Sequence, residues 1–165
     1  MIIIKTNIGN IELELFSDKA PKTCANFLKL IKAKYYNDTI FHRVIKGFMI
    51  QGGGLTSDMS PKKDPILMPI QNEADNGLSN QKYTIAMART MAPHSATSQF
   101  FINTIDNTFL DFKEKSPEGW GYCVFGKVTK GFDVVDKIEA VSTTRKPPYR
   151  DVPKEDIVIL EITEE

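Results

Sequence analysis

The chain is poor in the side chains that most enzymes use as metal ligands or nucleophiles. Its 165 residues include two cysteines and two histidines. Cys24 and Cys123 lie far apart and neither belongs to a C-x-x-C motif, so the sequence indicates neither a redox pair nor a zinc cluster. With His42 and His94 as the remaining soft ligands, we expect no metal site and no cofactor. Both cysteines are interpreted as small buried hydrophobic side chains.

Charge of one sign and long hydrophobic runs are also missing. The 21 basic residues balance 21 acidic ones, whereas a nucleic-acid-binding protein that relies on overall charge needs a basic excess. No apolar run approaches the roughly 18 residues of a membrane span, and the N-terminal segment lacks the pattern of a signal peptide. We therefore predict a cytoplasmic monomer without nucleic-acid or membrane partners.

The common catalytic motifs are absent as well. Gly47 and Gly52 have the spacing of a phosphate-binding loop, but glycines follow where lysine and a hydroxyl side chain are required. No G-x-S-x-G elbow of a serine hydrolase occurs. Glu12 and Glu14 lie two residues apart, on the outward face of an expected strand, so we interpret them as a solvated face rather than an acid–base pair.

Hydrophobic periodicity indicates two helices and many short strands. Helical spacing predicts helices at about 20–33, capped by Ser17 or Asp18, and at about 131–140. Residues 52–80 are rich in glycine, proline and asparagine and are expected to form a long loop, which at this length is often functional. Alternating or continuously apolar segments predict strands at 2–6, 11–16 (after a turn at Gly9-Asn10), 41–45, 48–51, 83–88, 99–104, 122–129 and 157–162.

These elements predict one domain that spans residues 1–165. The length fits a single domain, and no repeat, low-complexity tract or linker divides the chain. Short strands with few strand–helix–strand units favour a β-barrel or sandwich with helices closing it.

Residues 41–53, FHRVIKGFMIQGG, combine apolar side chains with isolated polar ones. Alternation places Arg43 on the apolar face of its segment, where an arginine is costly unless it meets a partner or a ligand. The segment SQFFIN at 98–103 repeats the pattern, with Gln99 and Phe101 on one face. From spacing alone two interpretations stay open, which are a core with satisfied polar groups and a ligand site.

Three ordered blocks make the sequence resemble a known family. They are FHRVIKGFMIQGGG at 41–54, MARTMAPHSATSQFFI at 87–102 and GWGYCVFGKV at 119–128. Together they resemble the cyclophilin family of peptidyl-prolyl cis–trans isomerases, in particular its short bacterial cytoplasmic type, from Met1 to Glu165. The resemblance implies a mainly β fold, a closed eight-stranded antiparallel β-barrel capped by two α-helices. It also implies an isomerase that acts on X–Pro bonds of protein chains and assists their folding.

The resemblance assigns roles to individual residues. Arg43 matches the catalytic arginine, and Gln51 matches a polar group that holds either Arg43 or a substrate carbonyl. The remaining matches are an apolar proline pocket (Phe48, Met49 and Phe101), a glutamine that holds the peptide backbone (Gln99), a strand-end pair that binds the residue before proline (Ala88 and Arg89), and two further substrate-binding positions (Trp120 and Tyr122).

Several positions depart from many eukaryotic members of the family. Arg89 stands in place of asparagine, Tyr122 in place of histidine, and Met91 is a one-residue insertion. Trp120 matches the tryptophan associated with cyclosporin, which makes cyclosporin a candidate ligand beside proline-containing peptides and unfolded protein chains. The departures concern substrate preference and drug affinity more than catalysis.

An isomerase of this kind needs no nucleophile, metal or proton transfer. Amide resonance gives the X–Pro bond a rotation barrier of about 18–20 kcal/mol. In the twisted transition state the prolyl nitrogen regains its lone pair and accepts hydrogen bonds. A guanidinium aimed at that nitrogen stabilises the twisted form more than the planar form, which is the requirement for catalysis.

Two other functions use the same pattern of residues. A proline-peptide-binding chaperone or scaffold module needs the apolar pocket but not Arg43, so the presence of Arg43, Gln51 and Gln99 together favours the enzyme. A β-barrel carrier of small apolar ligands needs an open interior, whereas the bulky strand residues predict a filled one.

Overall fold

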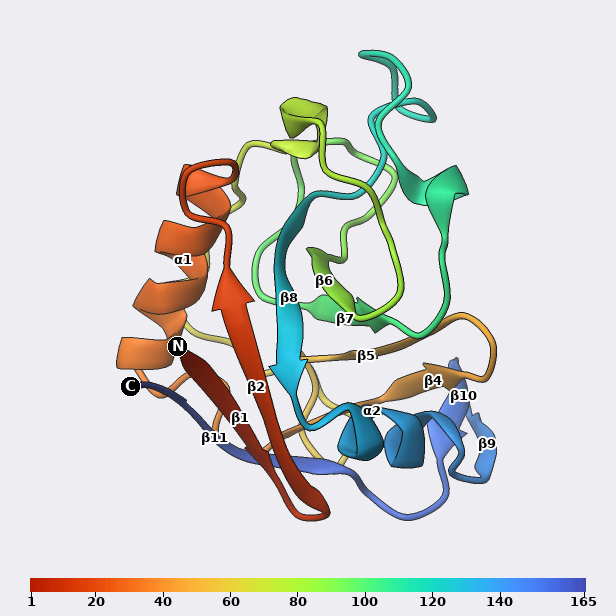
Figure 1. Cartoon of the computed structure of the whole chain (residues 1–165). Helices are drawn as coiled ribbons and strands as arrows, with labels where there is room; N and C mark the ends of the chain where they lie inside the picture. The colour runs from red at the N-terminus through yellow and green to blue at the C-terminus, as the bar shows by residue number, and fades with distance from the viewer.

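Nine short strands pair into one curled sheet in the computed structural model, which describes residues 1–165 (Figure 1). Every neighbouring pair is antiparallel. The order across the sheet is β3 (Thr39–Ile40), β11 (Val158–Glu164), β1 (Ile2–Thr6), β2 (Gly9–Leu15), β8 (Val124–Lys130), β6 (Thr84–Met87), β7 (Phe100–Asn103), β5 (Met49–Gly52) and β4 (Arg43–Ile45).

The two edge strands of this sheet follow each other in the chain. Phe41 and His42 alone separate β3 from β4, so the two edges are held together by a covalent link rather than by a backbone ladder. The outer side of β4 lies beside a small hairpin of β9 (Thr143–Lys146) and β10 (Tyr149–Pro153). The predicted mainly β architecture with two helices is confirmed, but the strand order is that of a nine-stranded sheet with two edges. The sequence did not predict the hairpin, because its strands lack apolar alternation.

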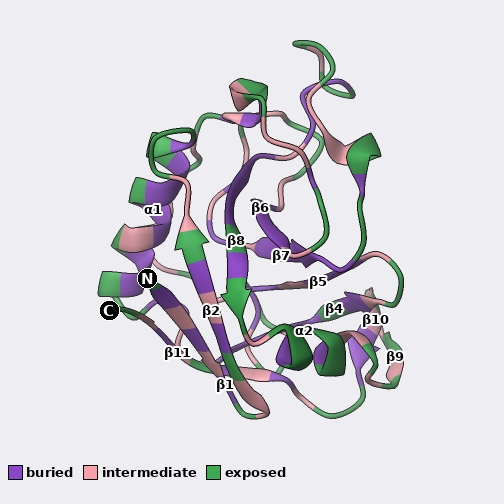
Figure 2. Ribbon diagram, in the orientation of Figure 1, coloured by how far each residue is buried: buried purple, intermediate pink, exposed green.

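Helix α1 (Pro21–Lys32) occupies the segment that helical spacing predicted, and it packs against β11. Neither Ser17 nor Asp18 caps it. The carboxylate of Glu73, from the long loop, accepts hydrogen bonds from the Lys22 amide at 3.3 Å and the Thr23 amide at 2.7 Å. The first-turn amides are thus satisfied by a residue distant in sequence. The inward side of the helix is buried and its outer side exposed (Figure 2), and the buried residues are Thr23, Cys24, Asn26, Phe27, Leu30 and Ile31.

Helix α2 (Phe132–Glu139) also matches its predicted segment and packs against β2, β4 and β5. It buries Val134, Val135 and Ile138. At its last residue, the carboxylate of Glu139 accepts a hydrogen bond from the Gly47 amide at 2.8 Å. The helix therefore also holds the turn between β4 and β5.

The β1–β2 hairpin turns at Asn7 and Ile8, two residues earlier than predicted. The Thr6 hydroxyl forms this turn because it donates to the Gly9 carbonyl at 2.6 Å and accepts from the Ile8 amide at 3.2 Å. A threonine hydroxyl that bonds to nearby backbone groups in this way favours a turn.

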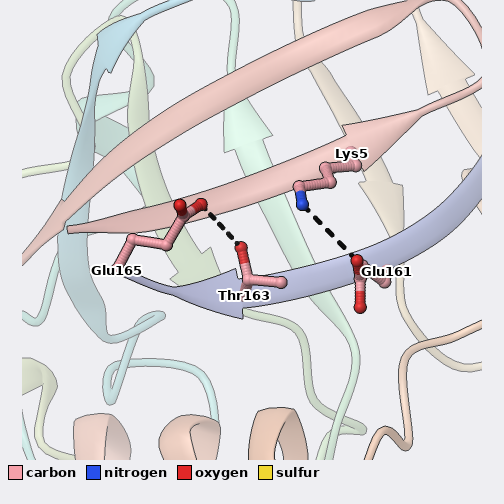
Figure 3. Close-up of polar contacts among 4 residues, drawn as sticks. All are labelled: Lys5, Glu161, Thr163 and Glu165. Atoms are coloured by element: carbon pink, nitrogen blue, oxygen red, sulfur yellow. Dashed lines mark hydrogen bonds and ion pairs between the residues drawn. The ribbon is translucent and has the colours of Figure 1, made fainter.

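The two chain ends lie side by side, where β1 pairs with β11. The Glu165 amide donates to the Met1 carbonyl at 2.8 Å. On the exposed side of this pair, Lys5 and Glu161 are direct cross-strand partners with a nitrogen–oxygen distance of 3.4 Å, and the Thr163 hydroxyl donates to the Glu165 carboxylate at 3.1 Å (Figure 3). Such an exposed ion pair contributes about 0.2–1 kcal/mol.

The buried hydrophobic residues form two clusters of unequal size. The larger contains 29 residues between the helices and the sheet, with Phe27 in edge-on contact with Phe100 and Phe125 at 5.8 and 5.1 Å between ring centroids. The smaller consists of Met49, Ala86, Phe101 and Val124. No helix has the length and apolar character needed to cross a membrane.

Candidate functional site

Strand register places the key polar and apolar side chains in one row. Arg43 on β4 lies opposite Gln51 on β5, Gln51 lies opposite Phe101 on β7, and Phe101 lies opposite Ala86 on β6. Directly paired residues of neighbouring strands share one face of a sheet. The row therefore brings the guanidinium, the amide and the phenyl ring to the same surface.

This surface contains a cavity of about 220 Å³. Gln99 and Trp120 are the two predicted site residues that do not line it, and Leu110 is a lining residue that the sequence analysis did not name. The nine lining residues are Arg43, Phe48, Met49, Gln51, Ala88, Arg89, Phe101, Leu110 and Tyr122.

A chain of two hydrogen bonds connects the polar side chains at the cavity. An Nη of Arg43 donates to Oε1 of Gln51 at 3.2 Å, and Nε2 of Gln51 donates to Oε1 of Gln99 at 2.9 Å. Gln51 thus contacts Arg43 directly and is itself held by Gln99. Arg43 is exposed, and its other guanidinium nitrogens make no hydrogen bond within the protein.

A second cavity, of about 170 Å³, adjoins the first. The two share Gln51, Ala88 and Arg89, and Gln99 lines the second. Its remaining lining residues are polar, namely Thr90, Ser95 and Thr97. The site therefore combines a hollow whose lining residues are mostly apolar with one whose lining residues are mostly polar, and Arg89 lines both.

A row of buried asparagines connects two residues that line the first cavity, Phe48 and Tyr122. The Asn107 amide donates to the Phe48 carbonyl and to Asn103 Oδ1, both at 2.9 Å, and the Asn103 amide donates to Asn80 Oδ1 at 3.0 Å. The Asn80 amide reaches the Tyr122 carbonyl at 3.3 Å. All three asparagines are at most 3% exposed, so these bonds satisfy polar groups that water does not reach.

The family model for cyclophilin type peptidyl-prolyl cis-trans isomerase/CLD matches residues 1–164. The chain belongs to this family. This cyclophilin is 56% identical over 163 residues to peptidyl-prolyl cis-trans isomerase B of Escherichia coli (strain K12), which covers 99% of this chain and 98% of that protein. It is 57% identical over 156 residues to peptidyl-prolyl cis-trans isomerase cyp18 of Streptomyces antibioticus. This match covers 94% of this chain and 93% of that protein.

Solved structures of the family share the fold of this cyclophilin. A cyclophilin-type isomerase of Cryptosporidium parvum, crystallised in the presence of the dipeptide Ala-Pro, has a TM-score of 0.80 at 30% sequence identity. The match covers 99% of this chain and 98% of that chain. The predicted family and isomerase class are thereby confirmed.

Trp120 is not brought to either cavity of this cyclophilin. Its side chain is 8% exposed and packs edge-on against His94 at 4.8 Å and Phe112 at 5.2 Å between ring centroids. Phe109 is 62% exposed and stacks on Phe48, a residue that lines the first cavity, with 5.9 Å between the ring centroids. The sequence signal for this segment was three apolar residues, Phe109, Leu110 and Phe112, between polar ones.

Burial favours the uncharged form of His42 and of both cysteines. Burial, and then the positive charge of Arg43, lower the pKa of His42 to about 4. Burial raises the pKa of Cys24 to about 11 and that of Cys123 to about 12. The interpretation of both cysteines as buried side chains is confirmed. No group of three or more histidine, cysteine or acidic side chains is arranged to hold a metal ion.

Proposed function

We propose that this cyclophilin catalyses rotation about X–Pro bonds of protein chains and assists their folding, with the proline ring bound in the 220 Å³ cavity. The observation that carries the proposal is Arg43, a permanently charged donor held by Gln51 at the mouth of a largely apolar hollow. No covalent intermediate is needed.

The apolar walls have the task of holding the pyrrolidine ring while the residue before proline rotates. Met49 and Phe101 are 2% and 4% exposed, so they present fixed surfaces, and Phe48 closes the side that Phe109 covers. Proline carries no N–H, so an apolar pocket binds its ring without leaving a donor unpaired. The apolar surroundings also strengthen electrostatic interactions inside the cavity.

Arg43 supplies the stabilisation of the twisted amide. Its guanidinium has donors without partners in the protein, and these can bond to the prolyl nitrogen once the lone pair is localised there. Each tenfold acceleration requires about 1.4 kcal/mol of such preferential stabilisation. The Gln51–Gln99 chain holds the guanidinium in place before substrate binds, so little reorganisation is required at the moment of rotation.

In this proposal the polar cavity next to the apolar one binds the peptide backbone. Gln99, Ala88 and Arg89, which line this polar cavity, bind the residues before proline in this proposal, and Tyr122, which lines the first cavity, packs against the Arg89 guanidinium. Ala88 lies one residue beyond the end of β6, and its amide donates to the Gln99 carbonyl at 2.9 Å.

Two-dimensional exchange NMR on an X–Pro peptide tests this mechanism. Wild-type protein should speed cis–trans exchange, while Arg43→Ala should lose most of the acceleration yet keep the chemical shifts of a folded chain and still bind the peptide. A matched exposed variant, Arg145→Ala, should behave like wild type. If Arg43→Ala accelerates exchange as well as wild type does, the mechanism is wrong.

The same experiment decides the alternative function, a proline-peptide-binding chaperone or scaffold module without essential turnover. Binding of the peptide without faster exchange in the wild-type protein would favour that module. The polar chain through Arg43, Gln51 and Gln99 supports the enzyme, because a binding module needs the pocket only.

The predictions about binding partners, barrel closure, oligomeric state and cellular location remain proposals. Proline-containing peptides and unfolded chains are the proposed partners, which the Ala-Pro dipeptide used with the Cryptosporidium parvum relative supports. Cyclosporin loses the support that Trp120 gave it, because Trp120 lines neither cavity. A closed barrel is supported by the two-residue link between the edge strands. One domain, a monomer and a cytoplasmic location rest on the sequence arguments alone.

A further inference from the structure

Two guanidinium groups and no carboxylate line the paired cavities. Arg43 lines the apolar cavity, Arg89 lines both, and neither aspartate nor glutamate belongs to either lining. The three ion pairs of the protein involve neither arginine. Because the whole chain has a formal net charge of zero, this uncompensated positive charge is a local property of the site.

Arg89 is held rigidly without being neutralised. Its Nε donates to the Gly121 carbonyl and one Nη donates to the Thr90 carbonyl, both at 2.9 Å. The guanidinium carbon lies 4.6 Å from the ring centroid of Tyr122. All of these partners are uncharged, and the second Nη makes no hydrogen bond within the protein. A planar cation fixed in this way loses little conformational entropy when it meets a carboxylate.

We propose that Arg89 makes this cyclophilin prefer proline-containing segments that carry an acidic side chain one or two residues before the proline. The inference rests on the proposed function, in which the proline ring fills the apolar cavity and the preceding residues cross toward the polar one. Gln51, Ala88 and Arg89 line both cavities, so a chain that passes from one to the other passes Arg89.

The geometry also predicts which side chains are disfavoured. A lysine before the proline would lie near two cations with no carboxylate in the cavity linings to compensate it. A glutamine of the same length would meet the hydroxyl and amide groups of the polar cavity without a net charge interaction. The expected order of preference is therefore glutamate, then glutamine, then lysine, and because Arg89 is partly exposed the differences should shrink as salt screens the charges.

A panel of otherwise identical X–Pro peptides tests the inference, with glutamate, glutamine or lysine at each of the two positions before proline. The measured quantity is kcat/KM for cis–trans exchange. In wild-type protein at low salt, glutamate should exceed glutamine by about threefold to fivefold at one position, the upper part of the range of about 1.4-fold to fivefold that an exposed ion pair supplies. In Arg89→Gln this ratio should fall by about half or more, since the contribution of the ion pair is lost.

Arg145→Gln is the matched control, because it removes an exposed guanidinium that lines neither cavity. It should keep the wild-type preference. A glutamate-to-glutamine ratio near one at both positions in wild type, or an unchanged ratio in Arg89→Gln, would overturn the inference. Those results would not contradict the proposed isomerase activity as long as exchange of the glutamine peptides is accelerated. Failure to accelerate any peptide would instead contradict the proposed function.

Discussion

Replacing Asn103 with alanine should remove the centre of the row of asparagines that connects Phe48 and Tyr122 at the first cavity. The Asn103 amide donates to Asn80 Oδ1 and Thr84 Oγ1, both at 3.0 Å, and its Oδ1 accepts from Asn107 at 2.9 Å. The side chain is 0% exposed, so water does not replace these three bonds. At about 1 kcal/mol for each bond, the free energy of unfolding should fall by about 3 kcal/mol.

Urea denaturation and thermal unfolding followed by circular dichroism measure this loss. A decrease of about 3 kcal/mol corresponds to a drop in Tm of about 6–12 °C for a chain of this size. Asn10→Ala is the matched control, since Asn10 is exposed and its side chain makes no hydrogen bond, and its effect should stay within about 0.5 kcal/mol.

Loss of Asn103 should also affect peptide binding, because the row of Asn80, Asn103 and Asn107 holds residues that line the cavity. Asn107 and Asn80 donate to the carbonyls of Phe48 and Tyr122, which both line the cavity. A looser row should raise KM for an X–Pro peptide at temperatures where the variant is still folded. Stability equal to wild type within about 0.5 kcal/mol, together with an unchanged KM, would refute the role assigned to these asparagines.

Two further predictions concern the cavity wall and the buried histidine. Phe101→Ala should cost about 3–5 kcal/mol of stability because the ring is buried. It should also raise KM for X–Pro peptides more than it lowers kcat, and an unchanged KM in exchange NMR would contradict the wall assignment. His42 has a folded-state pKa of about 4 against 6.5 in a model peptide, so the unfolded chain binds its proton first. Stability should therefore fall by about 3 kcal/mol as the pH drops from 6.5 toward 4. Urea titrations across that pH range should show that the free energy of unfolding declines less in His42→Gln than in wild type. An equal decline in both proteins would contradict the lowered pKa of His42.

Local sequence determined the elements on which the site is built. The helical stripe within Pro21–Lys32 is a property of neighbouring residues, because one face of a helix must be apolar to be buried. Alternation around Arg43 predicted the strand β4, but the buried residue of that strand is Val44, while Arg43 is exposed. The family blocks likewise predicted Arg43, Gln51 and the residues of the apolar pocket, all of which line one cavity. For these residues the chain's own pattern was sufficient.

Tertiary structure decided the partners. Glu73 rather than Ser17 satisfies the start of α1, because an unpaired backbone N–H donates to any carboxylate that the fold brings within reach. Gln51 holds Arg43 because antiparallel register sets them opposite each other, and Trp120 packs on His94 rather than lining the cavity. Contacts between residues far apart in sequence depend on how whole elements pack, and no local pattern encodes that arrangement.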